Sequence, residues 1–377
     1  MQNNTMLLDD ALLEKVDVTL LIIIAFQGLW TFLGNACVVT TIFRYKTLRE
    51  RKEYLLISYL SSCECLFGLA FVLAASSYMY NGGFERLPAW SCMLRPQILI
   101  FMVSLSTMGA ANVAVSFDRV LALSRPIFYF TLKSSYTRKL CLCAFSASVP
   151  ASLVCYLAGA YHHYYRQTPA TGESIDEFDC KFYNMRNFPQ KPLLYAHLLI
   201  YAVLLPTVSV ILYLTVPFAY RNYARKMAAA SPDNDEHDEQ TSQAYVQQQE
   251  ERARTQRHLT ITFGLSALMT FICIVVTSAL RVALIGVFDP TTEAIVNRCL
   301  TVVVNCNPMA NVTLYAVRHK DLRKGMYDVI RCRSNMVAPI TNEIHLRAFG
   351  AKNGAVGVPK PAGLKPVAVP DMVVTKS

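Results

Sequence analysis

The sequence predicts an all-α membrane protein, in which a bundle of seven transmembrane helices is followed by a short amphipathic eighth helix. The chain has 377 residues, of which 53% are hydrophobic and only 16% are charged, whereas soluble domains carry about 25% charged residues. Seven hydrophobic stretches reach the roughly 20 residues that a helix needs to cross about 30 Å of hydrocarbon. Because irregular backbone leaves its polar groups unsatisfied in lipid, these stretches are predicted to be helices.

The predicted bundle covers residues 18–317. Its helices occupy residues of about 18–43, 54–80, 96–117, 140–165, 192–220, 259–285 and 295–317. Glu64 in the second stretch is the only acidic residue within the seven, and the fifth contains a histidine, His197. The core helices of soluble proteins seldom remain uncharged over such lengths, so the pattern favours a membrane protein.

Basic residues gather in alternate connections, and such residues favour the cytoplasmic side of a membrane. They are Arg44, Lys46, Arg49, Arg51 and Lys52 after the first helix, Arg125, Lys133, Arg138 and Lys139 after the third, and Arg221, Arg225 and Lys226 after the fifth. We therefore expect a multi-pass protein of the plasma membrane. Residues 1–17 form an extracellular N-terminal tail, residues 318–332 an amphipathic helix, and residues 333–377 a disordered cytoplasmic tail. The net charge of +10 suits anionic lipid better than nucleic acid.

Four positions suggest covalent modification. Asn3 begins an Asn-Asn-Thr sequon on the outer side, where glycosylation and an unmodified side chain are both open. Cys92 and Cys180 fall in outer segments of this topology and are expected to form a disulfide, because that compartment is oxidising. Cys332 follows the last predicted helix and is either a palmitoylation site or a free thiol.

Two motifs at the inner ends of helices indicate a family. Asp118 and Arg119 close the third helix, and Pro126 follows seven residues after the arginine. The seventh helix ends in an Asn-Val-Thr-Leu-Tyr segment from Asn311 to Tyr315. These resemble the Asp-Arg-Tyr and Asn-Pro-x-x-Tyr motifs of rhodopsin-like, class A, G-protein-coupled receptors. The second motif lacks its proline, a form similar to that of nematode serpentine chemoreceptors and FMRFamide-like peptide receptors.

Other positions agree with this resemblance, and some depart from it. Asn35 follows a glycine as in the family's first helix, and Glu64 takes the place of the family's acidic residue in the second. An alternative register reads Asn307-Pro308 as the Asn-Pro pair, but no tyrosine then follows at the right distance. Val120 replaces the family's tyrosine, and the sixth helix has neither the usual tryptophan nor the usual proline. A divergent invertebrate receptor fits these departures.

The resemblance implies a non-enzymatic receptor that activates a heterotrimeric G protein. Asp118, Arg119, Pro126, Asn311 and Tyr315 would serve coupling and activation. A polar cluster in the core would contain Glu64, Asn35 and Asn307, with a sodium ion or water near Glu64. A protonated Glu64 that is hydrogen-bonded to its neighbours is the alternative, since buried charge in a membrane is costly.

The ligand remains open between a neuropeptide and a small chemosensory molecule. The third helix has no acidic residue between Cys92 and Asp118, so the usual anchor for a protonated amine is missing. Arg281 and Arg298 could bind a carboxylate or extend toward the interface; Phe101 and His197 are further candidate contacts. The competing class is a seven-helix channel or transporter, which predicts repeats or polar residues spread over several helices.

Overall fold

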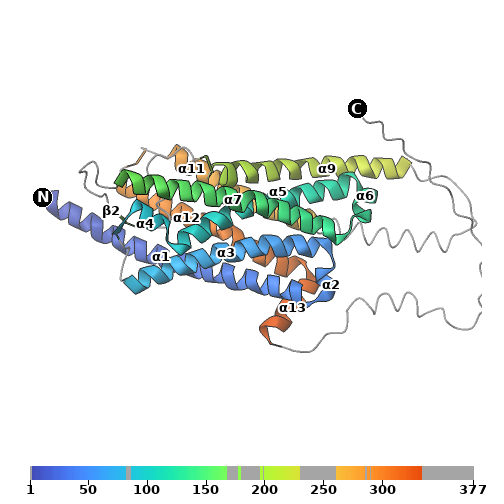
Figure 1. Cartoon of the computed structure of the whole chain (residues 1–377), viewed down its shortest axis with the longest axis horizontal. Coiled ribbons are helices and arrows are strands. Elements are labelled where there is room, and N and C mark those ends of the chain that lie inside the picture. Colours follow the sequence, from blue (N-terminus) through green and yellow to red (C-terminus); the bar gives the residue numbers. More distant parts are fainter. Residues whose placement is uncertain are drawn as a thin grey trace, which may run out of the picture. The chain divides into compact units, whose positions relative to one another are not determined.

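The computed structural model describes residues 2–81, 86–167, 177–179, 196–197, 199–229, 260–284, 287–288 and 290–332. In this part of the chain, seven helices are long and apolar enough to cross a membrane (Figure 1). These spans are Val18–Arg44, Lys52–Asn81, Pro96–Ser124, Ser134–Tyr161, Leu199–Val216, Thr260–Ala283 and Ile295–Arg318. The predicted all-α bundle is therefore confirmed.

The long elements follow the predicted order. They are α1 (Gln2–Arg44), α3 (Lys52–Asn81), α5 (Pro96–Ser124), α7 (Ser134–Gln167), η3 (Leu199–Leu204) with α9 (Leu205–Ala229), η4 (Phe271–Val276) with α11 (Thr277–Ala283), and α12 (Pro290–Arg318). The helix α13 (Lys320–Ile330) lies within the segment predicted as amphipathic. Short helices that the sequence did not reveal are α2 (Lys46–Arg49), α4 (Ala89–Met93) and α6 (Pro126–Thr131).

Several helices extend beyond their apolar stretches. α7 starts at Ser134 rather than near residue 140, and α5 continues to Ser124 rather than ending near residue 117. α1 begins at Gln2, so the segment predicted as an N-terminal tail is helical from that residue. Helical hydrogen bonds form within the segment itself, so a helix continues through polar residues where the apolar run stops. Asp118 and Arg119 consequently lie inside α5.

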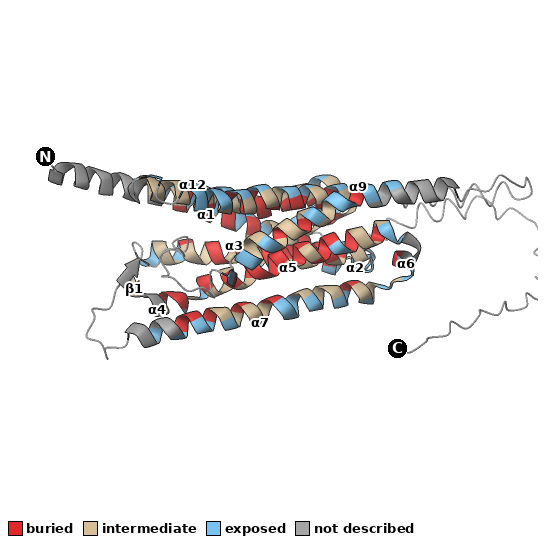
Figure 2. Ribbon diagram, turned by 90° about the horizontal axis from the view of Figure 1, so that it is seen from above, coloured by how far each residue is buried: buried red, intermediate tan, exposed pale blue. Residues whose placement is uncertain are grey.

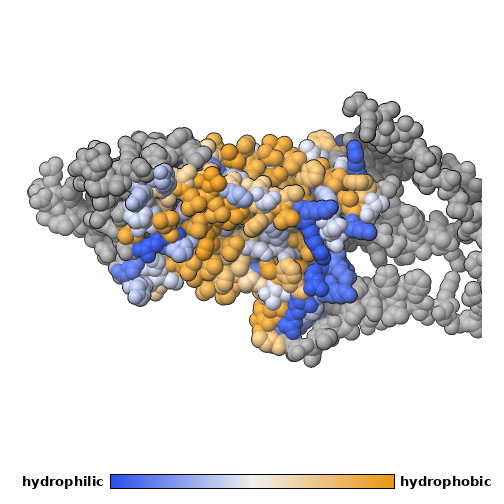
Figure 3. Space-filling model, in the orientation of Figure 1, coloured by the Kyte–Doolittle hydropathy of each residue, from blue (hydrophilic) through white to orange (hydrophobic). Residues whose placement is uncertain are grey.

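Buried residues are concentrated on α5 and α3, near the middle of the bundle (Figure 2). The outward faces of α7 and α9 instead expose large apolar side chains. Examples are Leu142, Val154, Leu157, Ile211 and Leu214. Figure 3 shows the resulting hydrophobic belt, with hydrophilic side chains gathered near α2 and α13. An exposed apolar surface of this extent suits contact with lipid.

α1 and α3 pack closely because two glycines face each other. A methyl group at Gly68 would lie 2.6 Å from the backbone nitrogen of Phe32 and 2.7 Å from the carbonyl oxygen of Gly28. Both obstacles are backbone atoms, which cannot rotate away as a flexible side chain can. Small residues at this crossing let the two helices approach, as is common between membrane helices.

Among the described residues, two helical segments have the wider π geometry. η3 precedes Pro206, while η4 lies in the sixth span, where the family's proline is missing. The hydroxyl of Thr277 donates to the carbonyl oxygen of Ile272, five residues earlier, at 3.4 Å. A π turn leaves the regular α-helical hydrogen-bond ladder locally and is often found at functional positions.

The end of the bundle opposite α13 carries a small antiparallel sheet. The strand β1 (Arg86–Pro88) pairs with β2 (Glu177–Asp179), so that Arg86 lies opposite Asp179 and Pro88 opposite Glu177. We call this end of the molecule the β1–β2 end, and the other, which carries α2, α6 and α13, the α13 end. The tail predicted to be disordered, residues 333–377, lies outside the described residues.

Candidate functional site

A buried ion pair occupies the last turns of α5 at the α13 end. The guanidinium of Arg119 donates to Asp118 Oδ2 through Nη2 and, at 3.1 Å, through Nε. Both side chains are fully buried. A charged pair inside a protein is stable only when the two groups face each other and find further hydrogen bonds. The pair therefore has to be held by its surroundings.

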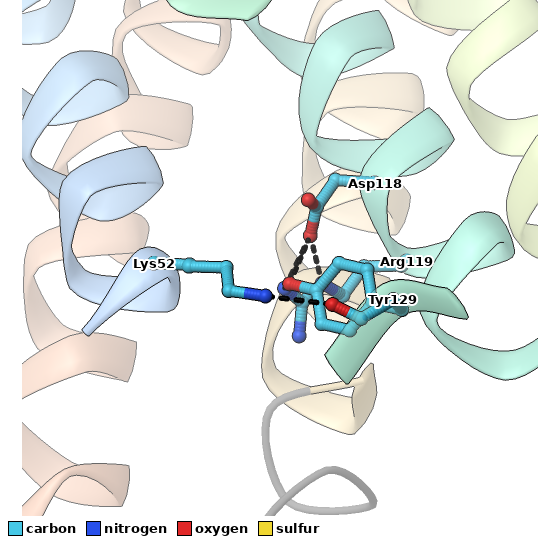
Figure 4. A network of polar contacts seen from close by, with 4 residues as sticks. All are labelled: Lys52, Asp118, Arg119 and Tyr129. Atoms are coloured by element: carbon cyan, nitrogen blue, oxygen red, sulfur yellow. Dashed lines mark hydrogen bonds and ion pairs between the residues drawn. The ribbon is translucent and has the colours of Figure 1, made fainter. Parts of the chain in front are cut away.

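Tyr129 on α6 provides those further bonds (Figure 4). Its hydroxyl donates to Asp118 Oδ2 at 3.1 Å and accepts from Arg119 Nη2, also at 3.1 Å. Burial raises the pKa of the Tyr129 phenol above its ordinary value, although the nearby guanidinium of Arg119 opposes the shift. The phenol thus remains a neutral donor at physiological pH.

Two features hold α6 against this ion pair: the proline at which the helix begins and a lysine of α3. The helix begins at Pro126, whose fixed φ suits the first helical position. Lys52, the first residue of α3, donates from Nζ to the carbonyl oxygen of Tyr129 at 2.7 Å. The same ammonium lies 4.4 Å from the centre of the Tyr129 ring, a cation–π contact. Tyr129 is therefore held at both its backbone and its ring.

The sixth span closes the other side of the arginine. The guanidinium carbon of Arg119 lies 5.4 Å from the centre of the Phe263 ring, and Phe263 is buried. A cation is attracted to the face of an aromatic ring within about 6 Å. Arg119 thus contacts α6 through a hydrogen bond and the sixth span through an aromatic ring.

A polar cluster links α12, α3 and the sixth span. The side-chain nitrogen of Asn311 donates to Glu64 Oε1, while its oxygen accepts from the hydroxyl of Ser266 at 2.6 Å. One turn away, the hydroxyl of Thr270 donates to Asn307 Oδ1 at 3.1 Å. The structure thus joins Glu64 to Asn311 directly, and it places Asn307 against the sixth span.

Asn35 and Tyr315 complete the set predicted for this region. Asn35 Nδ2 donates to the carbonyl oxygen of Thr31 in its own helix at 3.0 Å, and Tyr315 is fully buried near the α13 end of α12. Among the described residues, Asn35 Oδ1 and Glu64 Oε2 have no hydrogen-bond donor. Carboxylate and amide oxygens are the ligands that hard cations prefer, so these residues fit a sodium ion.

The two candidate arginines lie on neighbouring helices toward the β1–β2 end. Arg281 on α11 donates from Nη2 to the carbonyl oxygen of Asn297 at 3.3 Å and to Thr301 Oγ1 at 2.6 Å. Arg298 on α12 is 4% exposed. Neither guanidinium therefore lies free at the surface, as a side chain extending to the interface would.

His197 and Phe101 take part in packing between helices. His197 Nε2 lies 3.0 Å from the hydroxyl oxygen of Ser106 on α5 and 3.2 Å from that of Ser152 on α7. Phe101 packs in an aromatic group with Phe67 and Phe71 of α3, at ring distances of 5.4 and 6.0 Å. Their proposed contact with a ligand stays a prediction.

The modification sites are described only in part. Cys92 is buried and disulfide-bonded, while Cys180, its expected partner, lies outside the described residues. Cys332 is exposed and its backbone takes a φ of 49°, a left-handed conformation just after α13. Asn3 falls in the first turn of α1, where the structure describes the backbone alone.

The sequence did not reveal Tyr129, Lys52 or Phe263 as parts of the site. Tyr129 is ten residues from Arg119. The two become neighbours only because the chain turns after α5 and packs α6 against the last turns of that helix. Lys52 looked like one of several basic loop residues, and Phe263 like an ordinary apolar helix residue. The one available signal for Tyr129 was an aromatic residue soon after Pro126.

Comparison with known proteins agrees with this architecture. A family model described as "7 transmembrane receptor (rhodopsin family)" matches residues 34–315, which is most of the chain. The matched segment includes the Asp118–Arg119 pair, the polar cluster and the candidate arginines. A comparison with curated proteins finds no match. The chain therefore belongs to the rhodopsin family of seven-transmembrane receptors.

Proposed function

We propose that this receptor binds an extracellular ligand near its β1–β2 end and activates a heterotrimeric G protein at its α13 end. The observation that supports this most directly is the burial of Arg119, a permanently charged group, in contact with Asp118, Tyr129 and Phe263. In this proposal, these contacts belong to the resting state. A shift to a second helix packing would free the arginine for a partner protein.

The proposed movement involves the sixth span. Its residues Ser266 and Thr270 are bonded to Asn311 and Asn307 of α12, so a change in α12 would be passed to it. The π turn η4 lies directly after Thr270 and would allow bending without the family's proline. Phe263, on the side of that turn toward the α13 end, would then leave Arg119.

The proposed orientation rests on charge. Exposed basic side chains gather at the α13 end, at the last residue of α1 and on α2 and α13. They include Arg44, Lys46, Arg49, Lys320, Arg323 and Lys324. Such residues favour the cytoplasmic face and its anionic lipids. The N-terminus would then be extracellular and the protein would reside in the plasma membrane.

Two ligand classes follow from the family likeness, a neuropeptide and a small chemosensory molecule. A sodium ion held by Glu64 and Asn35 would stabilise the resting packing, because its charge compensates a buried carboxylate next to Asn311. The rhodopsin-family match does not favour a channel or a transporter.

The test is guanine-nucleotide exchange in membranes that contain the receptor and each class of G protein. Peptide and small-molecule libraries would be applied separately to the wild type and to Arg119→Ala, with Arg125→Ala as the matched control because Arg125 is exposed. The proposal expects a response from one library that survives in the control and is lost in Arg119→Ala. An undiminished response in Arg119→Ala would overturn it.

A further inference from the structure

A stripe of buried polar residues runs along α12 from its β1–β2 end. Arg298, Thr301 and Asn305 are spaced by three and four residues and share one face of the helix. They are 4%, 7% and 2% exposed. A buried arginine and a buried amide in a membrane helix are costly and usually serve a function.

The neighbours of α12 show that this stripe faces the bundle interior. On one side, Gln27 of α1 donates to the carbonyl oxygen of Val302 at 3.2 Å and to the sulfur of Cys306 at 3.4 Å. On the other side, Arg281 of α11 donates to Thr301. Viewed down the axis of α12, Arg298 and Asn305 lie between Val302, which faces α1, and Thr301, which faces α11. Their side chains therefore point between α1 and α11.

Arg281 brings a second cation to the same place. Its two hydrogen-bond acceptors, the Asn297 carbonyl and the Thr301 hydroxyl, are both neutral. None of the ion pairs found among the described residues includes Arg281, and its buried Nε has no hydrogen-bond partner there. Glu293 in the first turn of α12 is the acidic residue nearest along the helix. The guanidinium thus retains both charge and a donor for an anion.

Asn305 marks the inner end of the stripe. Within the described part of the chain, neither its side-chain nitrogen nor its oxygen has a hydrogen-bond partner. Asn307 and Asn311, the next asparagines along α12, both have side-chain partners. A buried amide without partners destabilises a protein unless another molecule satisfies it.

We propose that the ligand of this receptor is a small organic acid whose carboxylate binds Arg281 and Arg298 and whose second polar group bonds to Asn305. The seven helical steps from Arg298 to Asn305 span about 10 Å, which is the length of about three extended residues. This inference rests on the proposed receptor function and specifies its ligand class. It disfavours amidated peptides, because their C-terminal group is neutral.

The test compares matched pairs of compounds. Tripeptides and N-acetyl dipeptides would each be made with a free C-terminal carboxylate and with a carboxamide, and medium-chain ω-hydroxy acids would be paired with their amides. Each compound is added to the purified receptor in detergent, and the shift in unfolding temperature is measured. At least one acid is expected to stabilise the wild type, while its amide does not. Stabilisation by amides alone, or by neither set, overturns the proposal.

Variants then identify the binding groups. Arg281→Gln is expected to weaken binding of the active acid by about 10- to 100-fold, and Arg281→Lys by less, since the charge is kept. Asn305→Leu is expected to raise the unfolding temperature of the ligand-free receptor and to weaken binding of the same acid. A lower temperature with unchanged binding would show that Asn305 is merely structural, and would overturn its assigned role.

The binding measurement needs no G protein, so the two proposals can fail separately. An acid that stabilises the receptor but never promotes nucleotide exchange would support the ligand class and count against coupling. Nucleotide exchange that responds only to compounds without an anionic group would support coupling and overturn the ligand class. Each result with Arg281→Gln is read beside the unfolding transition of the same variant without ligand, since a cooperative transition at an unchanged temperature reports that the variant is folded.

Discussion

The phenol of Tyr129 lies 3.1 Å from the carboxylate of Asp118, although the two residues belong to different helices. Tyr129 also accepts from Arg119, so one hydroxyl holds both members of the buried ion pair. This contact ties the short helix α6 to the end of α5. Any partner that withdraws Arg119 from Asp118 must also break the bond from Tyr129.

Removal of this hydroxyl is expected to raise basal activity. Tyr129→Phe loses hydrogen bonds to two charged groups, each contributing about 1.5–3 kcal/mol, and these bonds exist in the resting packing. Because about 1.4 kcal/mol is a factor of ten, this loss should raise basal nucleotide exchange at least tenfold in membranes without ligand. The measurement is nucleotide-analogue binding at equal receptor number.

Tyr136→Phe is the matched control. Among the described residues, the hydroxyl of Tyr136 is buried and has no hydrogen-bond partner, so its loss should leave basal exchange unchanged. Equal increases in both variants would show that a general loosening of this region, rather than the bond to Asp118, is responsible.

Sodium is expected to stabilise the resting receptor through Glu64. Replacing sodium with N-methylglucamine should lower the unfolding temperature of the purified wild type by roughly 2–4 °C, a loss of about 1 kcal/mol. Glu64→Gln keeps an acceptor for Asn311 but removes the charge, and its unfolding temperature should not depend on sodium. A sodium effect of the same size in Glu64→Gln would place the ion elsewhere.

The contact between α1 and α3 is expected to tolerate no side chain at Gly68. Gly68→Ala places a methyl group 2.6 Å from a backbone atom, so the helices must separate, which costs about 1–3 kcal/mol or more. Surface expression should fall sharply. Gly264→Ala is the control, because the added methyl would lie 3.8 Å from the Tyr213 ring, an ordinary contact. Normal expression of both variants would contradict this packing.

Loss of the disulfide at Cys92 is expected to destabilise the β1–β2 end. Cys92→Ser should lower stability by about 2–5 kcal/mol and reduce surface expression, whereas Cys299→Ser should not, since Cys299 is an exposed free thiol. Mass spectrometry of unreduced peptides checks the predicted pairing with Cys180. A Cys92 peptide linked to any other cysteine would show that pairing to be wrong.

The sequence was sufficient for the fold because hydrophobic length is a direct physical requirement of a membrane helix. The spans at Lys52–Asn81 and Pro96–Ser124 contain the predicted apolar stretches. The helix ends were less predictable, because the backbone of α7 remains helical through the polar residues from Ser134 onward. The strands β1 and β2, of three residues each, carry too short a pattern to be recognised.

The functional residues were predictable where a motif marked them and not where folding brought them together. Asp118, Arg119 and Asn311 stand in recognisable spacing. Tyr129 and Phe263 reach Arg119 only through the path of α6 and the packing of the sixth span. Phe263 is distant from Arg119 in the chain, and Tyr129 lies ten residues away on another helix, so no motif spacing marks either contact.

The role of the buried ion pair is best measured by basal nucleotide exchange in Asp118→Asn, because this experiment needs no ligand. Asparagine has the size of aspartate but lacks the charge that holds Arg119, so we expect exchange at least tenfold above the wild type with one class of G protein. The double variant Asp118→Asn, Arg119→Ala should return to background. Activity that stays at the wild-type level in Asp118→Asn, or that persists in the double variant, would contradict the role of the buried ion pair.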